Sequence, residues 1–364
     1  MSGIVGDNTD EGSGQIAAVQ GITTSSSDPA LDTNPSDGVG AMFVNITSGE
    51  MYICTDATAG SNIWTNAGAG EGSIPKISPW GARGVFGGGI PSEDIEYVTI
   101  ATIGNTTEFG ELTVGRSYFG SASSGVRGVF AGGGPATTEI IDYITISTPG
   151  NAYDFGDLTS GRTVAGNVNG WSSGTRGVFG GGGSTSGYQN VIDYITIDTL
   201  GNATDFGNLT QSRYGAGAYG SLVRCVWAGG YYGSAQNTMD YITIATIGDA
   251  QDFGDMNWSG SHTKGCSSEA GRGLIAGGYP SYNTNIDYVA IDTLGNGTDF
   301  ADLTQGRFEP GSTSSGTRGL WVGGYSGSQS DVIDYVTIAT IGGNALDFGD
   351  LETAGAGAAC VAGG

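Results

Sequence analysis

Few residues in this chain could carry out catalytic chemistry. It has a single histidine, His262, so any catalytic set based on imidazole would have to use that residue. A copper centre needs several His or Tyr ligands, and one histidine is too few. The four cysteines (Cys54, Cys225, Cys266 and Cys360) show no metal-binding spacing. We therefore predict no catalytic residues, no metal and no cofactor.

Short motifs that could suggest an enzyme have simpler explanations. Asp-Phe-Gly begins at Asp154, Asp205, Asp252 and Asp347, so it is a repeated element and not the kinase motif, whose other parts are missing. The glycine run at 180–183 is not followed by Lys-Ser/Thr, which argues against a phosphate-binding loop. Acidic clusters at 7–11 and 28–37 lack calcium-loop spacing, and we interpret them as solvated charge.

A module that recurs six times organises the chain. Its acidic-Tyr pair falls at Tyr97, Tyr143, Tyr194, Tyr241, Tyr288 and Tyr335, separated by 46, 51, 47, 47 and 47 residues. A downstream phenylalanine keeps the same step, at Phe109, Phe155, Phe206, Phe253, Phe300 and Phe348. A period in the forties with strand-like content indicates a propeller blade or a solenoid rung.

The residue pattern of each module predicts four strands. Around Arg176, Arg-Gly-Val-Phe alternates small and large residues and ends at glycines, and 190–197 is rich in β-branched and aromatic residues. The Gly-Asn step at 201–202 is typical of a tight turn, and Asp-Phe-Gly lies in a third strand. The segment from Arg213 to Arg224 supplies a fourth. Four antiparallel strands per period, without helical periodicity, predict an all-β fold of β-propeller blades.

The order of these features resembles the kelch repeat over roughly residues 80–364. The resemblance rests on the glycine pair, the following tyrosine, a later aromatic residue, and an arginine before the next module. Asp-Phe-Gly stands where kelch repeats usually carry tryptophan. The resemblance implies a kelch-like β-propeller.

The ends of the chain bear on the number of blades. Residues 358–364 are a seventh copy of the glycine-pair strand, and 41–65 contains two alternating strands followed by Ile63-Trp64. We favour seven blades, the last closed by N- and C-terminal strands, because a ring cannot leave an edge exposed. The alternative is six blades, with the 41–72 hairpin segment as a small separate domain. A Cys54–Cys360 disulfide would suit the seven-blade arrangement, although buried free thiols are the favoured interpretation.

Charge is distributed unevenly. The formal net charge is −24, yet the arginines fall on two module positions: Arg83, Arg127, Arg176, Arg224, Arg272 and Arg318 open the inner strand, and Arg116, Arg162, Arg213 and Arg307 close the module. We expect these arginines to bridge backbone carbonyls or the recurring aspartates between blades. His262 is expected to replace a closing arginine. The acidic remainder argues against nucleic acid or anionic membranes as partners.

The N-terminal region differs from the repeats. Residues 1–40 are rich in Ser, Thr, Asp and Gly, and we predict an extended anchoring arm along another protein. No signal peptide or membrane-inserting stretch is predicted. Segments within 28–66 resemble those that precede glycine-rich repeats in virion and fibre proteins of tailed, especially marine, bacteriophages. This resemblance implies a virion protein made in a bacterial cytoplasm, with other virion proteins as partners through residues 1–40.

The loops after the glycine pairs vary most between modules. Strands alternate in direction, so these loops share one face with the loops that precede the closing arginines. They carry the candidate binding residues Tyr188, Tyr231, Tyr232, Tyr279, Tyr282 and Tyr325. Aromatic faces beside amides and hydroxyls suit carbohydrate stacking, although tyrosines covering a glycine-rich rim explain the pattern equally well.

We therefore predict a non-enzymatic virion protein (a capsid decoration, fibre or host-attachment module) that displays a β-propeller from domain 73–364 toward a host glycan or receptor. The alternative is a free lectin-like or protein-binding scaffold.

Overall fold

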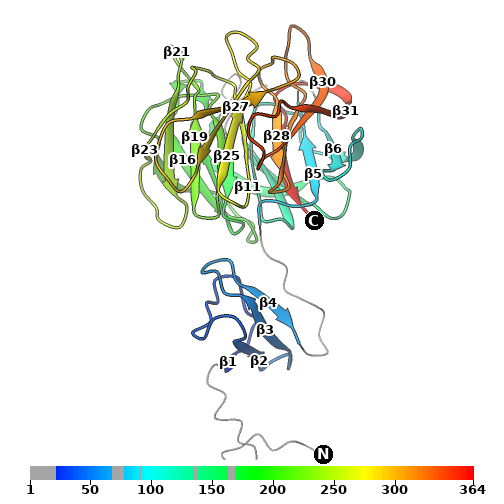
Figure 1. The fold of residues 1–364 in the computed structure, drawn as a ribbon, viewed down its shortest axis with the longest axis vertical. Helices are drawn as coiled ribbons and strands as arrows, with labels where there is room; N and C mark the ends of the chain where they lie inside the picture. Colours follow the sequence, from blue (N-terminus) through cyan, green and yellow to red (C-terminus); the bar gives the residue numbers. More distant parts are fainter. Residues whose placement is uncertain (1–21, 68–77, 90–91, 135–137, 163–168) are drawn as a thin grey trace, which may run out of the picture. The chain divides into compact units, whose positions relative to one another are not determined.

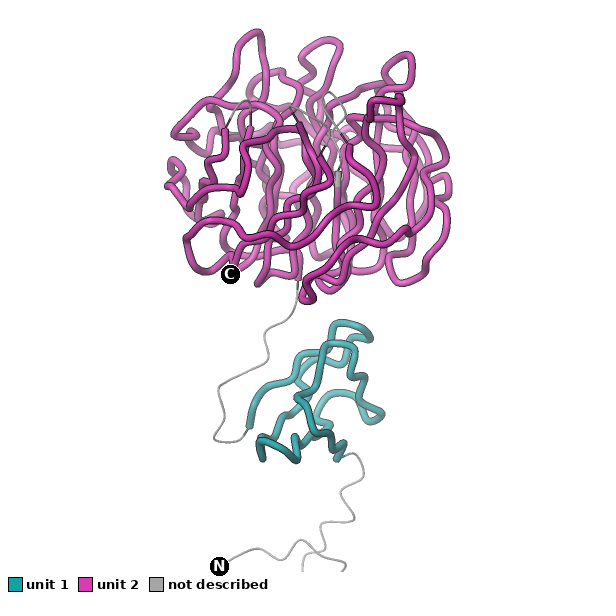
Figure 2. Tube along the Cα trace, turned by 180° about the vertical axis from the view of Figure 1, so that it is seen from behind, with its two compact units in different colours: residues 1–77 teal, residues 78–364 magenta. Residues whose placement is uncertain are grey.

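The computed structural model describes residues 22–67, 78–89, 92–134, 138–162 and 169–364. Every regular element in those ranges is a β-strand, which confirms the predicted all-β class. Within the same ranges, no helix is long and apolar enough to cross a membrane. The chain divides into two compact units, residues 1–77 and 78–364 (Figure 2).

The first unit is built on one small sheet. Its strands are β1 (Ile22–Ser25), β2 (Met42–Asn45), β3 (Met51–Asp56) and β4 (Ile63–Asn66), in the order β1-β2-β3-β4. β1 pairs with β2 in parallel, and the other two pairings are antiparallel. Alternation along β2 and β3 turns Phe43, Tyr52 and Cys54 to one side, where they pack with Trp64.

This sheet corrects two expectations. Residues 22–40 are not an extended arm, since β1 joins the sheet and the Asn62 side chain donates a 2.6 Å hydrogen bond to the buried Leu31 carbonyl. The remainder of the predicted arm, residues 1–21, lies outside the described residues. The 41–66 strands also do not complete a blade with the C-terminal strand, because they pair with one another.

The second unit contains six four-stranded antiparallel sheets within the described residues, numbered here in chain order (Figure 1). Sheet 1 is β32 (Ala359–Gly363), β5 (Arg83–Gly87), β6 (Asp94–Thr99) and β7 (Thr107–Glu111). Sheet 2 is β8 (Gly120–Ser123), β9 (Arg127–Ala131), β10 (Thr138–Thr145) and β11 (Tyr153–Arg162). Sheet 3 is β12 (Asn169–Ser172), β13 (Arg176–Gly180), β16 (Val191–Thr196) and β17 (Thr204–Asn208).

The remaining sheets repeat the same plan. Sheet 4 is β18 (Gly217–Gly220), β19 (Arg224–Ala228), β22 (Thr238–Thr243) and β23 (Gln251–Asp255). Sheet 5 is β24 (Lys264–Ser267), β25 (Arg272–Ala276), β26 (Asn285–Ala290) and β27 (Thr298–Asp302). Sheet 6 is β28 (Gly311–Ser314), β29 (Arg318–Val322), β30 (Ser330–Thr337) and β31 (Leu346–Gly355). Two loops carry short ribbons, β14 (Gly183–Ser184) with β15 (Gly187–Tyr188), and β20 (Tyr231–Tyr232) with β21 (Ser234–Ala235).

The C-terminal strand belongs to the first sheet. β32 pairs antiparallel with β5, with Cys360 opposite Phe86. The last strand of the chain therefore takes the innermost place beside β5, the place that β8 takes beside β9. The expected closure between N- and C-terminal strands is therefore wrong, because the partner of residues 359–363 is β5 of the first module and not the 41–65 hairpin.

Neighbouring sheets contact one another through their innermost strands. The contacts run β8–β12–β18–β24–β28–β32 and from β32 back to β8. Serine hydroxyls support them: Ser121 on β8 donates to the Cys360 carbonyl at 2.6 Å, and Ser314 on β28 donates to the Ser267 carbonyl at 2.7 Å. This cyclic order of sheets fits a propeller-like fold.

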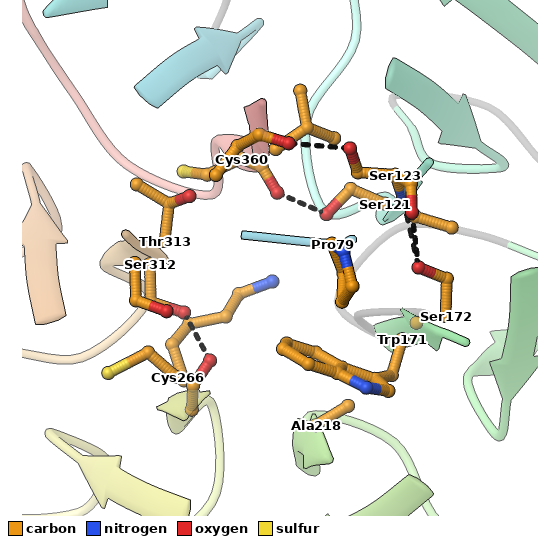
Figure 3. A pocket seen from close by; sticks show the side chains of 17 residues that line it. Pro79, Ser121, Ser123, Trp171, Ser172, Ala218, Cys266, Ser312, Thr313 and Cys360 are labelled. Atoms are coloured by element: carbon orange, nitrogen blue, oxygen red, sulfur yellow. Dashed lines mark hydrogen bonds between the residues drawn. The ribbon is translucent and has the colours of Figure 1, made fainter. Parts of the chain in front are cut away.

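Side chains from all six sheets line a narrow hub between the innermost strands. Figure 3 shows Trp171 and Pro79 at this central space, with Ser121 and Ser312 hydrogen-bonded to carbonyls of neighbouring strands around it. The hub cavity is about 50 Å³, which is room for a few water molecules. Among the described residues, side chains therefore fill the hub and leave no large ligand cavity there.

The opening arginines bridge adjacent sheets, as expected. Each guanidinium lies over the tyrosine of its own sheet and donates to an isoleucine carbonyl of the next. The bonds run Arg83 to Ile146 (2.8 Å), Arg127 to Ile197 (2.7 Å), Arg176 to Ile244 (2.8 Å), Arg224 to Ile291 (2.9 Å), Arg272 to Ile338 (2.6 Å) and Arg318 to Ile100 (2.8 Å). The last of these joins sheet 6 to sheet 1.

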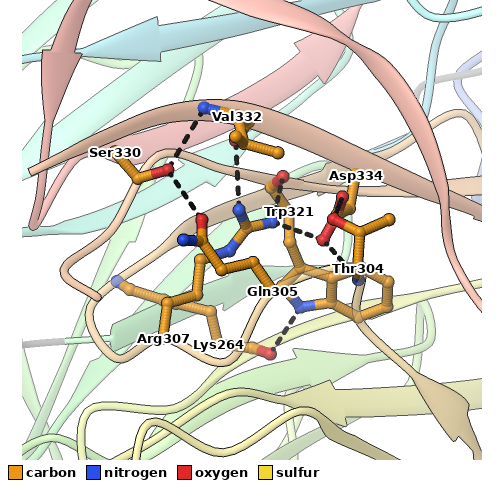
Figure 4. Close-up of polar contacts among 8 residues, drawn as sticks. All are labelled: Lys264, Thr304, Gln305, Arg307, Trp321, Ser330, Val332 and Asp334. Carbon is orange, nitrogen blue, oxygen red and sulfur yellow. Dashed lines mark hydrogen bonds and ion pairs between the residues drawn. The ribbon is translucent and has the colours of Figure 1, made fainter. Parts of the chain in front are cut away.

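The closing arginines form buried ion pairs with the recurring aspartates. The pairs are Arg116–Asp142 (2.9 Å), Arg162–Asp193, Arg213–Asp240 (3.0 Å) and Arg307–Asp334 (2.7 Å). In Figure 4, Arg307 also donates to the Trp321 and Val332 carbonyls, and Thr304 donates to Asp334. Because the carboxylate is hydrogen-bonded as well as paired, its charge is tolerated in the interior.

Candidate functional site

A belt of backbone hydrogen bonds surrounds one end of the hub. It passes through the residues two places after each closing position. The amide of Tyr118 donates to Gly357 O (2.8 Å), Gly357 to Glu309 O (2.9 Å), Glu309 to His262 O (2.9 Å) and His262 to Gly215 O (2.6 Å). The equivalent residue between sheets 2 and 3 lies outside the described residues. We call the contact between two neighbouring sheets a junction and number it by the sheet that precedes it in the chain, so that the sixth junction lies between sheets 6 and 1. The belt places one residue of each described junction around a common centre.

Three of these belt residues adopt a backbone conformation that favours glycine. Tyr118 has φ of 62°, and His262 and Glu309 both have φ of 59°. Left-handed non-glycine residues are destabilised by roughly 1–2 kcal/mol each, and such strain clusters at functional sites. The belt positions 215 and 357 are glycines, so the fold does not itself require a side chain here.

The belt side chains Tyr118, His262 and Glu309 and the side chain of Lys264 on β24 form a group that we call the polar cluster. His262 Nε2 lies 3.7 Å from Glu309 Oε1, and the Tyr118 hydroxyl is hydrogen-bonded to the Glu309 carboxyl. Lys264 is buried in the hub below them and acts on Glu309 through its charge. Tyrosine, histidine and carboxyl groups thus meet at the rim of the hub.

Burial brings two of these groups close to neutral pH. It raises the pKa of Glu309 to about 7, and the opposing effects of Tyr118 and Lys264 do not cancel it. Desolvation lowers the pKa of Lys264 to about 8. The protonation of the polar cluster therefore changes within the physiological pH range.

The structure corrects the expectation for His262. Counting seven residues from each module phenylalanine gives Arg116, Arg162, Arg213 and Arg307, and in the fourth module it gives Gly260. The Gly260 carbonyl accepts from Gly230 N, just as the Arg307 carbonyl accepts from Gly278 N, both at 2.8 Å. His262 lies two residues further on, in the belt, so it does not replace the arginine.

All six candidate tyrosines lie in one continuous set of ring contacts. We define the aromatic array as these tyrosines together with Tyr214, His262 and Phe308. The contacts are Tyr188–Tyr231 (6.1 Å between ring centroids), Tyr188–Tyr232 (5.7 Å), Tyr188–Tyr214 (5.3 Å), Tyr214–Tyr231 (5.4 Å), Tyr214–His262 (5.4 Å), His262–Phe308 (6.0 Å), Phe308–Tyr279 (5.8 Å), Phe308–Tyr282 (5.6 Å) and Phe308–Tyr325 (5.3 Å).

The array is accessible to solvent at its edges. Tyr188, Tyr232, Tyr279 and Tyr282 are exposed, whereas the joining rings of Tyr214 and Phe308 are half-buried. Its loops lie at the end of the unit where β21 is seen in Figure 1, opposite the C terminus. The array spans sheets 3 to 6 and meets the polar cluster at His262.

Sequence reasoning missed the residues that join the tyrosines. Tyr214 and Phe308 directly follow the closing position, and Tyr118, His262 and Glu309 come one residue later. Aligning the modules on the closing position would have shown glycine at the belt position in two modules and larger residues in the others. That irregularity at a structurally repeated site was the available signal.

The arrangement suits binding more than catalysis. Exposed aromatic faces can stack on the apolar faces of sugar rings, while the polar cluster offers hydrogen-bond donors and acceptors beside them. The cluster contributes one carboxyl group, whereas the common mechanism of glycoside hydrolysis uses two. Among the described residues, no group of three or more His, Cys, Asp or Glu side chains is placed to hold a metal ion.

No family model matches this chain, and no curated protein is similar to it in sequence.

Proposed function

We propose that residues 78–364 form a closed, kelch-like β-propeller of six blades that binds carbohydrate on its aromatic array. Support for the ring comes from the cyclic contacts of the innermost strands and from the Arg318–Ile100 bond between the last and first sheets. Six sheets of four strands account for every module, including the C-terminal strand. The seventh blade considered from the sequence has no strands left to build it among the described residues of 78–364.

One observation carries the binding function. Loops from four consecutive sheets bring their aromatic side chains into a single array, although nothing in the β-framework requires aromatic residues there. Phe308 and Tyr282 stack with ring planes 14° apart and centroids at 5.6 Å, so the array already contains one pair of stacked rings. Stacking on aromatic ring faces, completed by hydrogen bonds from the polar cluster, is how a neutral sugar is held.

The protein acts without catalysis in this proposal. Its single histidine is engaged with the array and with Glu309, and its cysteines are buried free thiols. It needs no metal or cofactor for sugar stacking. The strongly acidic composition disfavours nucleic acid and anionic membranes as partners.

We further propose that the propeller is displayed on a bacteriophage particle as a decoration, fibre or host-attachment module. The resemblance of residues 28–66 to virion and fibre segments supports this setting, and the N-terminal unit would attach the protein to other virion proteins. A free lectin-like or protein-binding scaffold is the second candidate, favoured equally by the array itself.

A glycan array tests the binding function. The wild-type protein is expected to bind a subset of bacterial surface glycans, and Tyr282→Ala to lose most of that signal. Tyr153→Ala is the matched control, because Tyr153 is exposed on β11 and outside the array. Absence of binding to any glycan, or equal binding by Tyr282→Ala, would contradict a carbohydrate site in the array.

Attachment is tested separately. The full chain and a variant lacking residues 2–77 are expressed in infected cells, and particles are purified by sedimentation. The proposal expects the full chain to co-sediment with particles and the shortened chain to stay behind. A full chain that never co-sediments would instead favour the free scaffold.

A further inference from the structure

The closing position is structurally equivalent at all six junctions. At each one, the carbonyl of the residue seven places after the module phenylalanine accepts a hydrogen bond from the second glycine of the preceding glycine pair. The acceptors are Arg116 (3.1 Å), Arg162 (3.2 Å), Arg213 (3.0 Å), Gly260 (2.8 Å), Arg307 (2.8 Å) and Gly355 (2.8 Å). Four junctions thus carry an arginine, and two carry a glycine on the same backbone frame.

The arginine has a constant role where it is present. Arg116 donates to Asp142 at 2.9 Å and to the Phe130 carbonyl at 3.2 Å, and its side chain is buried. Arg307 repeats both contacts, with Asp334 and the Trp321 carbonyl. Each guanidinium is held by a carboxylate and a carbonyl of the following sheet.

In the fourth module, a side chain of the module itself occupies the arginine's place. A Cβ atom on Gly260 would lie 1.9 Å from the Trp258 ring, so the indole leaves no room for a longer side chain. Asp287 is the equivalent of the aspartates that pair with the closing arginines, but Gly260 stands in place of its arginine. Burial raises the pKa of Asp287 to about 6. This junction is occupied, and it offers no site.

The sixth junction leaves the arginine's place open. A Cβ atom on Gly355 would have no neighbour closer than 3.9 Å, and Gly355 does not have a positive φ. A cavity of about 250 Å³ lies here, lined by Phe86, Glu96 and Gly355 among others. Phe86 and Glu96 are the equivalents of Phe130 and Asp142, so the cavity lies where the guanidinium lies at four other junctions.

The carboxyl group in this cavity is held in place as its equivalents are. Glu96 is 9% exposed and accepts hydrogen bonds from the Glu352 amide (3.1 Å) and the Thr106 hydroxyl. Asp334 accepts the same pair of donors, an amide and a hydroxyl, from Thr304 (3.2 and 2.5 Å). Asp94 and Ser92 add polar groups to the cavity lining.

We propose that the sixth-junction cavity binds a guanidinium group from outside the chain. The planar fork of a guanidinium matches a carboxylate and an adjacent carbonyl, and four internal examples in this protein show that geometry. Asp94 strengthens the local negative potential, and the net charge of −24 favours a cation. Because sheets 6 and 1 meet here, the ligand would link the two ends of the repeat region.

The test is thermal unfolding of the full chain with millimolar methylguanidinium or, as the control cation, methylammonium. We expect methylguanidinium to raise the midpoint relative to methylammonium in the wild type. Gly355→Arg, which supplies the guanidinium from within, should raise the midpoint without ligand and abolish the ligand-dependent shift. Glu96→Gln should abolish the shift as well, and Asp287→Asn should retain it.

Three results would overturn the proposal. One is equal midpoints with the two cations in the wild type. Another is a methylguanidinium shift that persists undiminished in both Gly355→Arg and Glu96→Gln. The third is loss of the shift in Asp287→Asn, which would assign the site to the fourth junction. An arginine-containing tripeptide, run in parallel, distinguishes a protein arginine from a small free guanidinium compound as the source.

Discussion

Gly156 of sheet 2 lies directly against Gly201 of sheet 3. The amide of Gly201 donates to the Phe155 carbonyl at 2.9 Å, and a Cβ atom on Gly156 would lie 2.6 Å from the carbonyl carbon and oxygen of Gly201. The same approach recurs between Gly207 and Gly248 and between Gly254 and Gly295. The glycine of Asp-Phe-Gly therefore allows the turn of the next sheet to pack against it without a steric clash.

Gly156→Ala should destabilise the protein by about 1–3 kcal/mol. The added methyl group would clash with the backbone of Gly201, and the φ of 144° is strained for alanine. Gly150→Ala is the matched control. It is a turn glycine without a positive φ and with nothing within 4 Å of its Cβ position, so its free energy of unfolding should stay near that of wild type. Chemical denaturation measures both, and equal effects would contradict this packing role.

Two aspartates at equivalent positions should respond to neutralisation in opposite directions. Asp334 is paired with Arg307, so Asp334→Asn leaves a buried cation unpaired and should cost about 3–5 kcal/mol. Asp287 has no arginine, because its junction carries Gly260, so Asp287→Asn should stabilise the protein at pH 7.5 by about 1–3 kcal/mol. Denaturant unfolding of both variants gives the comparison, and a loss of stability in Asp287→Asn would contradict this account.

The Asp287 effect should depend on pH in a defined way. Burial raises its pKa in the folded state from 3.8 to about 6. The unfolded chain thus releases this proton first, and stability from this group is complete below pH 4 and is lost as pH rises through 6. The advantage of Asp287→Asn should therefore disappear near pH 4, which unfolding measured across pH 4 to 8 can establish.

The four cysteines should be inert in the folded protein. Cys54, Cys225, Cys266 and Cys360 are buried free thiols, and burial raises the pKa of Cys360 to about 12. We expect almost no reaction with iodoacetamide under native conditions and four reactive thiols after denaturation without reductant. Only two reactive thiols after denaturation would indicate a disulfide.

The repeat could be read from the sequence because its recurring residues make the contacts between sheets. Arg176 donates to the Ile244 carbonyl, and Gly156 packs against Gly201. A substitution at either residue would disturb the contact between two sheets, so the same residue types recur in the sequence at these positions. Strand alternation at 42–66 showed that strands exist but not which strand each pairs with. Pairing is decided in three dimensions, and there the hairpin closes on β1 instead of β32.

The candidate site was predictable only in part. The six tyrosines stood out because their loops vary against a constant framework. Glu309 and Tyr118 did not, because they are isolated in the sequence and meet only when the belt brings their junctions together. The cavity at Gly355 was equally hidden, since a missing side chain leaves no motif.

Ring closure is the claim on which the aromatic array and the sixth-junction cavity both depend, and one pair of arginines tests it most directly. Arg83 and Arg318 both lie 4.5 Å over the tyrosines of their own sheets and donate to carbonyls of the next sheet at the same 2.8 Å. Of these two bonds, the one from Arg318 joins the last sheet to the first.

The measurement is the free energy of unfolding of Arg83→Ala and Arg318→Ala. In a closed ring both lose a tyrosine contact and one charged hydrogen bond of about 1.5–3 kcal/mol, so the two losses should agree. If Arg318→Ala costs less by the full value of that hydrogen bond, sheets 6 and 1 do not meet in solution, and the closed ring is wrong.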